Sequence, residues 1–219
     1  MRDMTEESDR PVSYREPRQA RSAATLARVL QAAEEIASSV GLEELTIAGV
    51  AERAGVSVGT IYRRFEDREQ LITALSERML ERREEYMAER LRSAEPSLSG
   101  VMDAYAHALL QSFADSSALF PELMRVRGAR SLDRGARTIT VIHRLLLDAA
   151  TPYAEQIRRS DPVAALETVA RAILGACFHN SVRPDPAIDE AARSRYADEL
   201  GDMAIAYLLT PDRVRSARA

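Results

Sequence analysis

The stretch Thr46-Ile-Ala-Gly-Val-Ala-Glu-Arg-Ala-Gly-Val-Ser-Val-Gly-Thr-Ile-Tyr-Arg-Arg-Phe65 predicts two short helices joined by a tight turn. Such a pair requires particular residue types at fixed offsets. Ala51 is small enough for the next helix to cross close by, and Gly55, four residues later, can form a left-handed turn without a Cβ penalty. Ile61, six residues further on, can anchor the second helix in the core. The spacing therefore predicts a helix-turn-helix.

The second helix of this pair is expected from Val58 to Phe65, with Ser57 as its cap. Its exposed side carries Val58, Gly59, Thr60, Tyr62, Arg63 and Arg64. Small residues at its start let the backbone come close to base edges in a major groove. Val58 can touch a thymine methyl group, and Thr60 offers a hydroxyl or a methyl group. A Gly-Thr pair weakens a helix without a packing gain unless another molecule must approach there, so the pattern favours DNA binding.

Other residues around this helix are suited to phosphate oxygens. Tyr62, Arg63 and Arg68 can donate hydrogen bonds to a DNA backbone. The N–H groups at the helix starts capped by Thr46 and Asp67 can add contacts, because helix N-termini attract anions. The alternatives are a helical hairpin that never touches DNA, a partly buried Tyr62 and a solvated face for Arg64.

Two longer helices flank this motif. Residues 20–40 repeat apolar side chains at three- and four-residue steps and are followed by Gly41, which is typical of an amphipathic helix. Asp67 caps a further helix whose apolar stripe continues to Leu91, and Pro96 closes that segment. No linker composition separates this helix from the motif. One continuous helix is therefore expected to join the N-terminal part to the rest.

The run TIAGVAERAGVSVGTIYRRFEDREQL, preceded by EEIASSVGLEELT, strongly resembles the DNA-binding domain of the TetR family of repressors. The resemblance covers about residues 20–75. Two positions differ from the usual pattern: Val58 stands where a basic or polar residue is common, which leaves the operator sequence open, and Arg68 replaces the usual lysine and keeps its charge. The resemblance implies DNA contacts at Thr46, Ser57, Val58, Gly59, Thr60, Tyr62, Arg63 and Arg68.

Helical segments are also expected after Pro96, near residues 98–114, 118–128, 132–158, 162–182 and 188–209. Pro152 lies inside a periodic stretch, so it either kinks that helix or splits it. Pro162 follows Ser160 and Asp161, the pattern of a cap with proline at the first helical position. Ala, Leu, Arg and Glu dominate the composition, and all four are strong helix formers. An all-α fold of about nine helices is expected.

The resemblance implies that the C-terminal part holds a small-molecule cavity. For any one lining candidate, ordinary core packing is the alternative. His143 and His179 could supply polar contacts, or could be satisfied buried or surface histidines; the arginines at 125, 127, 130, 134 and 137 could attract an anion or form a solvated face. Adaptable Met and aromatic side chains suit a cavity. The candidates are Met79, Tyr86, Met102, Tyr105, Leu109, Phe113, Phe120, Met124, Ile142, His143, Leu146 and Phe178.

A homodimer is expected, because one recognition helix reads only a few base pairs and a two-fold pair doubles the contacts on a palindromic site. By resemblance, the last two long helices would pair with their symmetry mates as a four-helix bundle, with Ala165, Ala172 and Ala176 allowing close approach. The apolar stripes expected there are Val163, Leu166, Val169, Ala170, Ile173, Leu174 and Cys177, then Leu200, Met203, Ala204, Tyr207 and Leu208.

The amino-acid composition restricts the classes to which this protein can belong. With 46% hydrophobic and 29% charged residues, disorder of the whole chain is not expected. The net charge of −4 argues only mildly against nucleic acid, because DNA responds to local potential. The single cysteine, Cys177, excludes an internal disulfide and fits a reducing cytoplasm. No apolar run approaches the roughly 18 residues of a membrane span, and no secretory signal is visible, so a cytoplasmic protein is expected.

Catalysis is not expected. The sequence has no Gly-rich phosphate loop after a strand, no His-Glu-x-x-His motif and no nucleophile elbow. Cys177 and His179 are two residues apart on a helix and point to different faces. His107 and His143 lack carboxylates at useful helical spacing. No enzyme activity, cofactor or metal is expected.

The sequence thus predicts a flexible basic arm over 1–19, a helix-turn-helix domain over 20–67, a ligand-binding and dimerisation domain over 68–210, and a frayed tail over 211–219. Arg10, Arg15, Arg18 and Arg21 either enter a minor groove or belong to a solvated tail. The expected function is a dimeric one-component transcriptional regulator, a repressor released from a palindromic operator by a small, largely apolar ligand. An activator, or a helical ligand-binding or interaction protein without DNA binding, remains an alternative.

Overall fold

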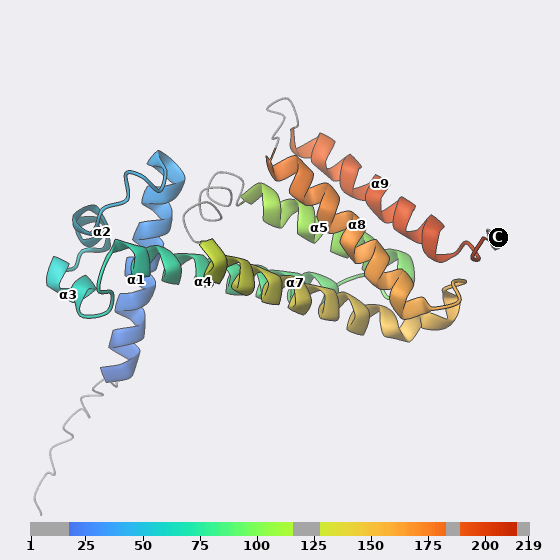
Figure 1. The fold of residues 1–219 in the computed structure, drawn as a ribbon, viewed down its shortest axis with the longest axis horizontal. Coiled ribbons are helices and arrows are strands. Elements are labelled where there is room, and N and C mark those ends of the chain that lie inside the picture. Colours follow the sequence, from blue (N-terminus) through green and yellow to red (C-terminus); the bar gives the residue numbers. More distant parts are fainter. Residues whose placement is uncertain (1–17, 116–127, 183–188, 214–219) are drawn as a thin grey trace, which may run out of the picture.

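The computed structural model describes residues 18–115, 128–182 and 189–213, and every regular element in these ranges is helical (Figure 1). This confirms the predicted all-α class. The helix expected near 118–128 lies almost wholly outside the described residues, as do most of the N-terminal arm and residues 214–219. The elements are α1 (Arg18–Val40), α2 (Ile47–Ala54), α3 (Val58–Tyr62), α4 (Arg68–Arg92), α5 (Leu98–Asp115), α7 (Gly128–Ala150), the 3-10 helix η1 (Thr151–Gln156), α8 (Pro162–Val182) and α9 (Glu190–Leu208).

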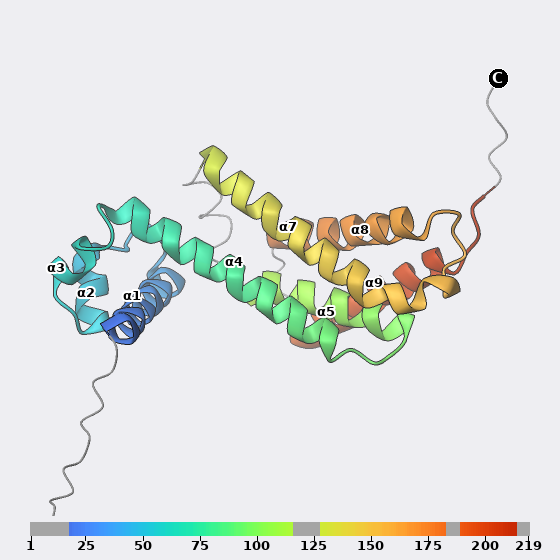
Figure 2. The same cartoon turned by 90° about the horizontal axis from the view of Figure 1, so that it is seen from below.

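The buried side chains form two separate clusters joined by α4. Helices α1 to α3 and the first turns of α4 make one lobe. In the other lobe α5 and α7 pack against the second half of α4, and α8 and α9 pack on α5 (Figures 1 and 2). Leu71, Ile72 and Leu75 of α4 are fully buried in the first cluster, whereas Met87 and Leu91 are buried in the second. Because α4 is continuous, tilting it moves the first lobe relative to the second.

The turn between α2 and α3 forms as the sequence predicts. The Thr46 side chain accepts a hydrogen bond from the Gly49 N–H at 3.1 Å, and the Ser57 hydroxyl accepts one from the Thr60 N–H at 3.2 Å. Gly55 lies in the left-handed region at φ 63° and ψ 41°. The N–H of Val56 then donates to the carbonyl of Ala51 at 3.0 Å, which satisfies the end of α2.

Helix α3 is shorter than predicted and ends at Tyr62 rather than Phe65. The Phe65 side chain is only 7% exposed and packs into the first core, so the chain must turn back beneath α3 before Asp67 caps α4. The predicted end of α3 followed the polar pattern and did not take the burial of the Phe65 side chain into account.

Proline decides the boundaries of α7 and α8. Pro152 splits its segment: α7 ends at Ala150, and η1 begins at Thr151. Proline has no N–H to donate to the carbonyl four residues back, and its ring would clash with that carbonyl, so the α-helix cannot continue. Pro162 is the first residue of α8, and the Asp161 carboxylate accepts a hydrogen bond from the Ala164 N–H at 3.0 Å.

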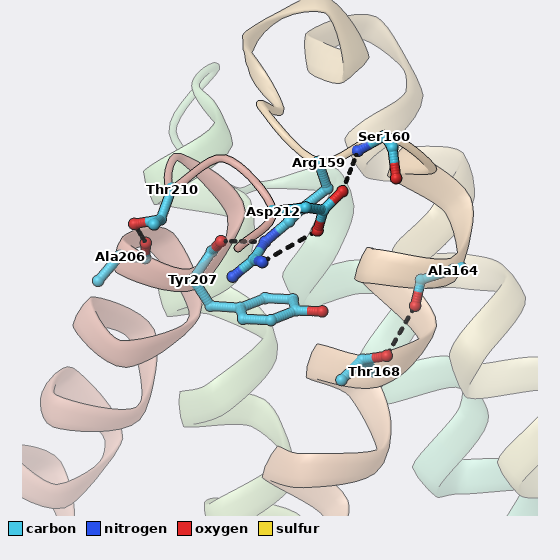
Figure 3. A network of polar contacts seen from close by, with 8 residues as sticks. All are labelled: Arg159, Ser160, Ala164, Thr168, Ala206, Tyr207, Thr210 and Asp212. Carbon is cyan, nitrogen blue, oxygen red and sulfur yellow. Dashed lines mark hydrogen bonds and ion pairs between the residues drawn. The ribbon is translucent and has the colours of Figure 1, made fainter. Parts of the chain in front are cut away.

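A polar network fastens the end of α9 to the turn before α8 (Figure 3). The Arg159 guanidinium lies 3.8 Å from the ring centre of Tyr207, donates to the Tyr207 carbonyl at 2.8 Å and contacts Asp212 at 3.1 Å. The Ser160 N–H donates to the other Asp212 oxygen at 2.8 Å. Hydrogen bonds from Ser160, with a smaller effect of Arg159, lower the pKa of Asp212 to about 2. The tail expected to fray from residue 211 is therefore held at Asp212.

Replacing Gly55 by alanine tests the turn. A Cβ at Gly55 would meet no atom within 4 Å, so the cost arises only from the left-handed backbone, about 1–2 kcal/mol. We expect Gly55→Ala to lower the free energy of unfolding by that amount in urea titrations of the full chain. Gly59→Ala is the matched control: Gly59 is helical, and its Cβ would meet only the Ser57 hydroxyl, at an ordinary contact distance of 3.9 Å. This variant should be as stable as the wild type or slightly more stable. Equal stability of the two variants would contradict the assigned role of Gly55.

Candidate nucleic-acid interface and effector cavity

Helix α3 presents one side to the core and the other to the surface. Ile61 is fully buried and fixes the helix, whereas Val58 and Tyr62 are 40% and 54% exposed. A Cβ at Gly59 would meet only the Ser57 hydroxyl, at 3.9 Å. The space in front of Gly59 is therefore not needed by this chain, and another molecule can approach the backbone there.

Polar side chains along α3 form hydrogen bonds with one another. The hydroxyls of Ser57 and Thr60 lie 2.9 Å apart, and the Arg63 guanidinium donates to the Thr60 hydroxyl at 3.0 Å. Ser57 and Arg63 are exposed, and Thr60 is half-buried. Thr46 is also exposed, at the start of α2 beside α3. Of the eight sequence-predicted DNA-contact residues, the structure leaves six exposed and one half-buried around α2 and α3: Thr46, Ser57, Val58, Gly59, Tyr62 and Arg63 are exposed, and Thr60 is half-buried.

Arg68, the eighth, is directed inward. Its Nε donates to the Leu45 carbonyl at 2.6 Å, and its Nη2 donates to the carbonyls of Leu42 and Glu43. These carbonyls lie between α1 and α2, where helical partners are missing, and a guanidinium can satisfy several of them at once. Arg68 therefore closes the connection between α1 and α2.

Arg64 is another arginine of this region with an internal role. Its Nη2 donates to the Ser22 carbonyl at 2.8 Å and to the Ser22 hydroxyl, so it ties the end of α3 to the start of α1. Its exposed position in the pattern suggested a solvated side chain, because sequence spacing does not show that α1 passes nearby.

The start of α4 is less suited to phosphate than predicted. The Asp67 carboxylate accepts the Gln70 N–H at 2.8 Å, and the exposed carboxylates of Glu66 and Glu69 flank it. Negative charge at this helix end would repel a phosphate. The first turn of α2 carries no acidic residue, so the Thr46 end of α2 retains the favourable helix dipole.

A cavity of about 720 Å³ lies among α4, α5, α7 and α8. Its size is in the range of small-molecule sites. Of the sequence candidates, five line it: Leu109, Phe113, Ile142, His143 and Phe178. Sequence reasoning missed nine further lining residues: Leu80, Arg83, Gly135, Ala136, Thr138, Ile139, Arg171, Leu174 and Gly175. The two mid-helix glycines were the available signal, because glycine weakens a helix unless space is needed.

The other cavity candidates lie elsewhere. Met79 and Tyr86 line a separate crevice of about 460 Å³ next to α1, and Met102, Tyr105 and Leu146 are fully buried core residues. Phe120 and Met124 lie outside the described residues, as do Arg125 and Arg127. Apolar periodicity identifies the buried side of a helix, but it does not distinguish a residue facing a void from one facing a neighbouring side chain.

Two cavity residues carry nitrogen groups away from bulk water. The His143 Nε2 atom is buried without a hydrogen-bond partner, and burial, with a smaller effect of Arg171, lowers the pKa of this imidazole. The Arg83 side chain is buried; its Nη2 donates to the Ser112 carbonyl at 3.2 Å, and its guanidinium carbon lies 4.8 Å from the ring centre of Phe113. His179 is exposed on α8 and does not line this cavity.

The outer faces of α8 and α9 are less apolar than predicted. Most residues of the two stripes are buried within this chain, because α8 and α9 both pack on α5. The large apolar side chains left exposed on these helices are Val163, Phe178 and Met203, and Ala172 of α8 is exposed as well. Ala165 is buried.

The residues weighed for catalysis lie in separate surroundings. Burial raises the pKa of the Cys177 thiol to about 12, so the thiolate nucleophile is not formed near neutral pH. His107, expected to lack a carboxylate, lies 2.7 Å from Asp198 of α9, a pairing across helices that helical spacing could not reveal. Within the described ranges, no group of three His, Cys, Asp or Glu residues is placed to hold a metal ion. No helix there is long and apolar enough to span a membrane.

Comparisons with known proteins agree with this geometry. Residues 29–75 match the family model of bacterial regulatory proteins, tetR family. None of the curated proteins compared with the chain matches it.

Among solved structures, a TetR-family transcriptional regulator from Streptomyces coelicolor is 26% identical, with 84% of this chain and 99% of that chain covered and a TM-score of 0.55. SmeT, the repressor of the Stenotrophomonas maltophilia multidrug efflux pump SmeDEF, is 20% identical over 90% of this chain and 99% of its own, with a TM-score of 0.56. The superantigen PfiT is 18% identical over 84% and 96%, with a TM-score of 0.63.

The similarity to PfiT shows that the fold by itself does not define one role. The matched segment 29–75 is more specific, because it contains α2, the turn and α3. The chain therefore carries the DNA-binding domain of the TetR family, on the all-helical fold of TetR-family regulators.

Proposed function

We propose that this protein is a dimeric transcriptional regulator that represses by occupying a palindromic operator and is released by a small ligand. The observation that carries the proposal is the outward side of α3, where open space in front of Gly59 lies between exposed Val58 and Tyr62. A role on chromosomal DNA places the protein in the cytoplasm and requires no cofactor.

The proposed DNA contacts divide by chemistry. Val58, Gly59 and Thr60 would face base edges, where small side chains allow close approach in the major groove. Tyr62 and Arg63, with Ser57 and Thr46, would contact phosphates and set the register. Arg68 takes no part in the proposed interface, because its guanidinium is bonded to carbonyls between α1 and α2.

The proposed dimer uses the outer faces of α8 and α9. Exposed Val163, Phe178 and Met203 supply apolar contact area, and Ala172 allows two helices to approach closely. Two copies of α3 would then enter successive major grooves, about 34 Å apart on one face of the duplex. Similarity to the repressor SmeT supports repression of transcription rather than activation.

Helix α4 is the proposed link between ligand and DNA. Arg82 contacts both oxygens of Glu34 on α1, at 2.7 and 2.9 Å, and the adjacent Arg83 lines the cavity. A ligand that prefers one tilt of α4 would thereby change the spacing of the two α3 helices. A coupling of about 1–3 kcal/mol corresponds to a change in operator affinity of about 5- to 150-fold.

Selection of genomic fragments by the purified protein tests DNA binding. We expect the wild type to enrich palindromic fragments and to bind them as a dimer. Gly59→Ala should bind the selected site on the order of tenfold more weakly, the size of one lost base contact, because its methyl group would occupy the space of a base edge. Arg90→Ala is the control, because Arg90 is exposed on α4 and belongs neither to α3 nor to the cavity wall. A monomeric protein, no enriched fragment, or full affinity in Gly59→Ala would contradict the proposal.

Substitutions at Tyr62 and Thr60 separate positioning from base reading. Tyr62→Ala should weaken binding to all operator variants by a similar factor, because a phosphate contact carries no sequence information. Thr60→Ala should reduce the difference between the operator and single-base variants of it. Affinities for a panel of such variants provide the measurement, with Tyr62→Phe isolating the hydroxyl. Equal losses on every sequence for both alanine variants would refute the assignment.

The contact between Glu34 and Arg82 should affect DNA affinity without a direct DNA contact. The pair is partly exposed and so contributes about 0.2–1 kcal/mol, and we expect Arg82→Ala to weaken operator binding about two- to fivefold. The exchanged pair Glu34→Arg with Arg82→Glu should restore affinity. Arg90→Ala, at an exposed position further along α4, is the control. Loss of affinity in the exchanged pair equal to that of Arg82→Ala would contradict a role for this contact.

A further inference from the structure

The first turn of α3 carries small side chains. Its residues, from the cap onward, are Ser57, Val58, Gly59 and Thr60. In a helix-turn-helix, the first residues of the second helix are the ones that contact base edges in the major groove. Arg and Lys recognise guanine there, Asn and Gln recognise adenine, and Glu and Asp accept from cytosine. None of these residue types stands in this turn, so base selection by α3 needs another kind of contact.

The two hydroxyl groups of this turn are largely used within α3. The Ser57 hydroxyl accepts the Thr60 N–H at 3.2 Å, and the Thr60 hydroxyl accepts the Arg63 guanidinium at 3.0 Å. The two hydroxyls lie 2.9 Å apart, where one donates to the other. Since a hydroxyl has one proton and two lone pairs, a single proton and a single lone pair remain for other molecules. Ser and Thr hydroxyls also bond to more than one kind of base, so they discriminate weakly.

The arginines after this turn are bonded to the chain itself. Arg64 donates to the carbonyl and the hydroxyl of Ser22 on α1, and Arg68 donates to the Leu45 carbonyl. Both side chains therefore have fewer N–H groups left for DNA. Hydrogen bonds from arginine to guanine are the commonest specific contact in the major groove, and this surface does not favour them.

Val58 is the large apolar side chain that this turn exposes. It is 40% exposed, whereas Ile61 of the same helix is fully buried and fixes α3 on the core. A valine in a helix has one strongly preferred rotamer, so its two methyl groups are held in place before DNA arrives. Gly59, the next residue, has no side chain, and a Cβ there would meet only the Ser57 hydroxyl, at 3.9 Å. The approach to Val58 is therefore not narrowed by its neighbour.

The major groove displays an apolar group that matches Val58, the methyl group on C5 of thymine. The valine side chain has no donor or acceptor, so it gains from this methyl group and gains nothing from the polar edges of the bases. 5-Methylcytosine carries the same methyl group at the same place. It differs from thymine there in its N4 amino group, which valine does not read.

We infer that α3 selects its operator through the 5-methyl group of a pyrimidine that packs against Val58: thymine in ordinary DNA, and 5-methylcytosine as an equivalent. This inference rests on the proposed function and names the chemical group of the operator that is read. It implies that methylation of a cytosine at this position strengthens binding, so that the operator responds to cytosine methylation as well as to sequence.

Replacing single thymines by uracil tests the inference, because uracil lacks only the methyl group. The full-length protein first selects duplexes from a pool that is randomised over two half-sites one helical turn apart. In the selected duplex each thymine is then replaced singly, and affinities are measured by fluorescence anisotropy. We expect one position in each half-site to weaken wild-type binding about fourfold, the effect of one buried methyl group. Equal affinity for the thymine duplex and its fully uracil-substituted form would overturn the inference.

Variants at Val58 assign the contact. Val58→Ala, which loses both γ-methyl groups, should lose most of the difference between thymine and uracil at that position, and Val58→Thr, which keeps one, should retain part of it. Val141→Ala is the matched control, because Val141 is 39% exposed on α7 and belongs neither to α3 nor to the cavity wall. It should show the full wild-type difference. A uracil effect that persists undiminished in Val58→Ala would overturn the inference.

Cytosine at the same position gives the converse test. A C·G pair placed there, with and without the 5-methyl group, isolates the methyl group in otherwise identical duplexes. We expect wild-type protein to bind the methylated duplex about fourfold more tightly, and Val58→Ala to bind the two duplexes nearly alike. Equal or tighter binding of the unmethylated duplex by the wild type would overturn the inference.

These measurements keep the two proposals apart. Failure to select any duplex would refute the proposed function, and this inference with it. Selection of a duplex whose affinity does not depend on 5-methyl groups would overturn the inference and leave the proposed function intact.

Discussion

The structure depends on one helix being buried in two cores at once. Helix α4 places Leu71 and Leu75 in the core of the first lobe and Met87 and Leu91 in the core of the second. Both segments are close-packed, so neither can shift without cost to its own lobe. A displacement of α4 is therefore carried as a tilt of the whole helix. The cavity residues Leu80 and Arg83 lie between the two buried segments, where such a tilt can be favoured or opposed.

Two kinds of residue define the candidate DNA-binding surface: the side chains that are exposed on it, and the nearby arginines that bond to the chain's own backbone instead. Arg64 and Arg68 are bonded to carbonyls of the chain's own backbone and hold α3 and the α1–α2 connection in place. Arg63, by contrast, is exposed, and its guanidinium donates to the hydroxyl of the neighbouring Thr60. Since a guanidinium bonded to internal carbonyls has fewer N–H groups left for a phosphate, this surface offers fewer direct phosphate contacts than the count of arginines indicates, although each arginine keeps its positive charge.

The fold alone does not determine the role of this protein, because a superantigen shares it with transcriptional regulators. The distinction lies in particular residues. A helix that served only for packing would gain from alanine at position 59, whereas an open glycine between exposed Val58 and Tyr62 is suited to a surface that another molecule must approach. The same reasoning applies at Gly135 and Gly175, where open space lies in the cavity wall rather than on the surface.

The local structure of this protein follows from its sequence. The caps at Thr46, Ser57 and Asp67, the turn at Gly55 and the start of α8 at Pro162 were all predicted, because each depends on residues within a few positions of one another. At Pro152 the sequence allowed either a kinked helix or two separate helices. In the structure α7 ends before Pro152 and η1 follows.

Only the tertiary structure decided which polar side chains bond to distant parts of the same chain. Arg68 reaches carbonyls 23 to 26 positions earlier in the chain, and His107 meets Asp198 across 91 positions. Likewise, Met102 and Leu109 lie on the same helix with similar apolar character, yet the first faces packed neighbours and the second a void. Periodicity reports which side of a helix is buried, but contacts between helices depend on how several of them cross, and that is set by the packing of the whole chain.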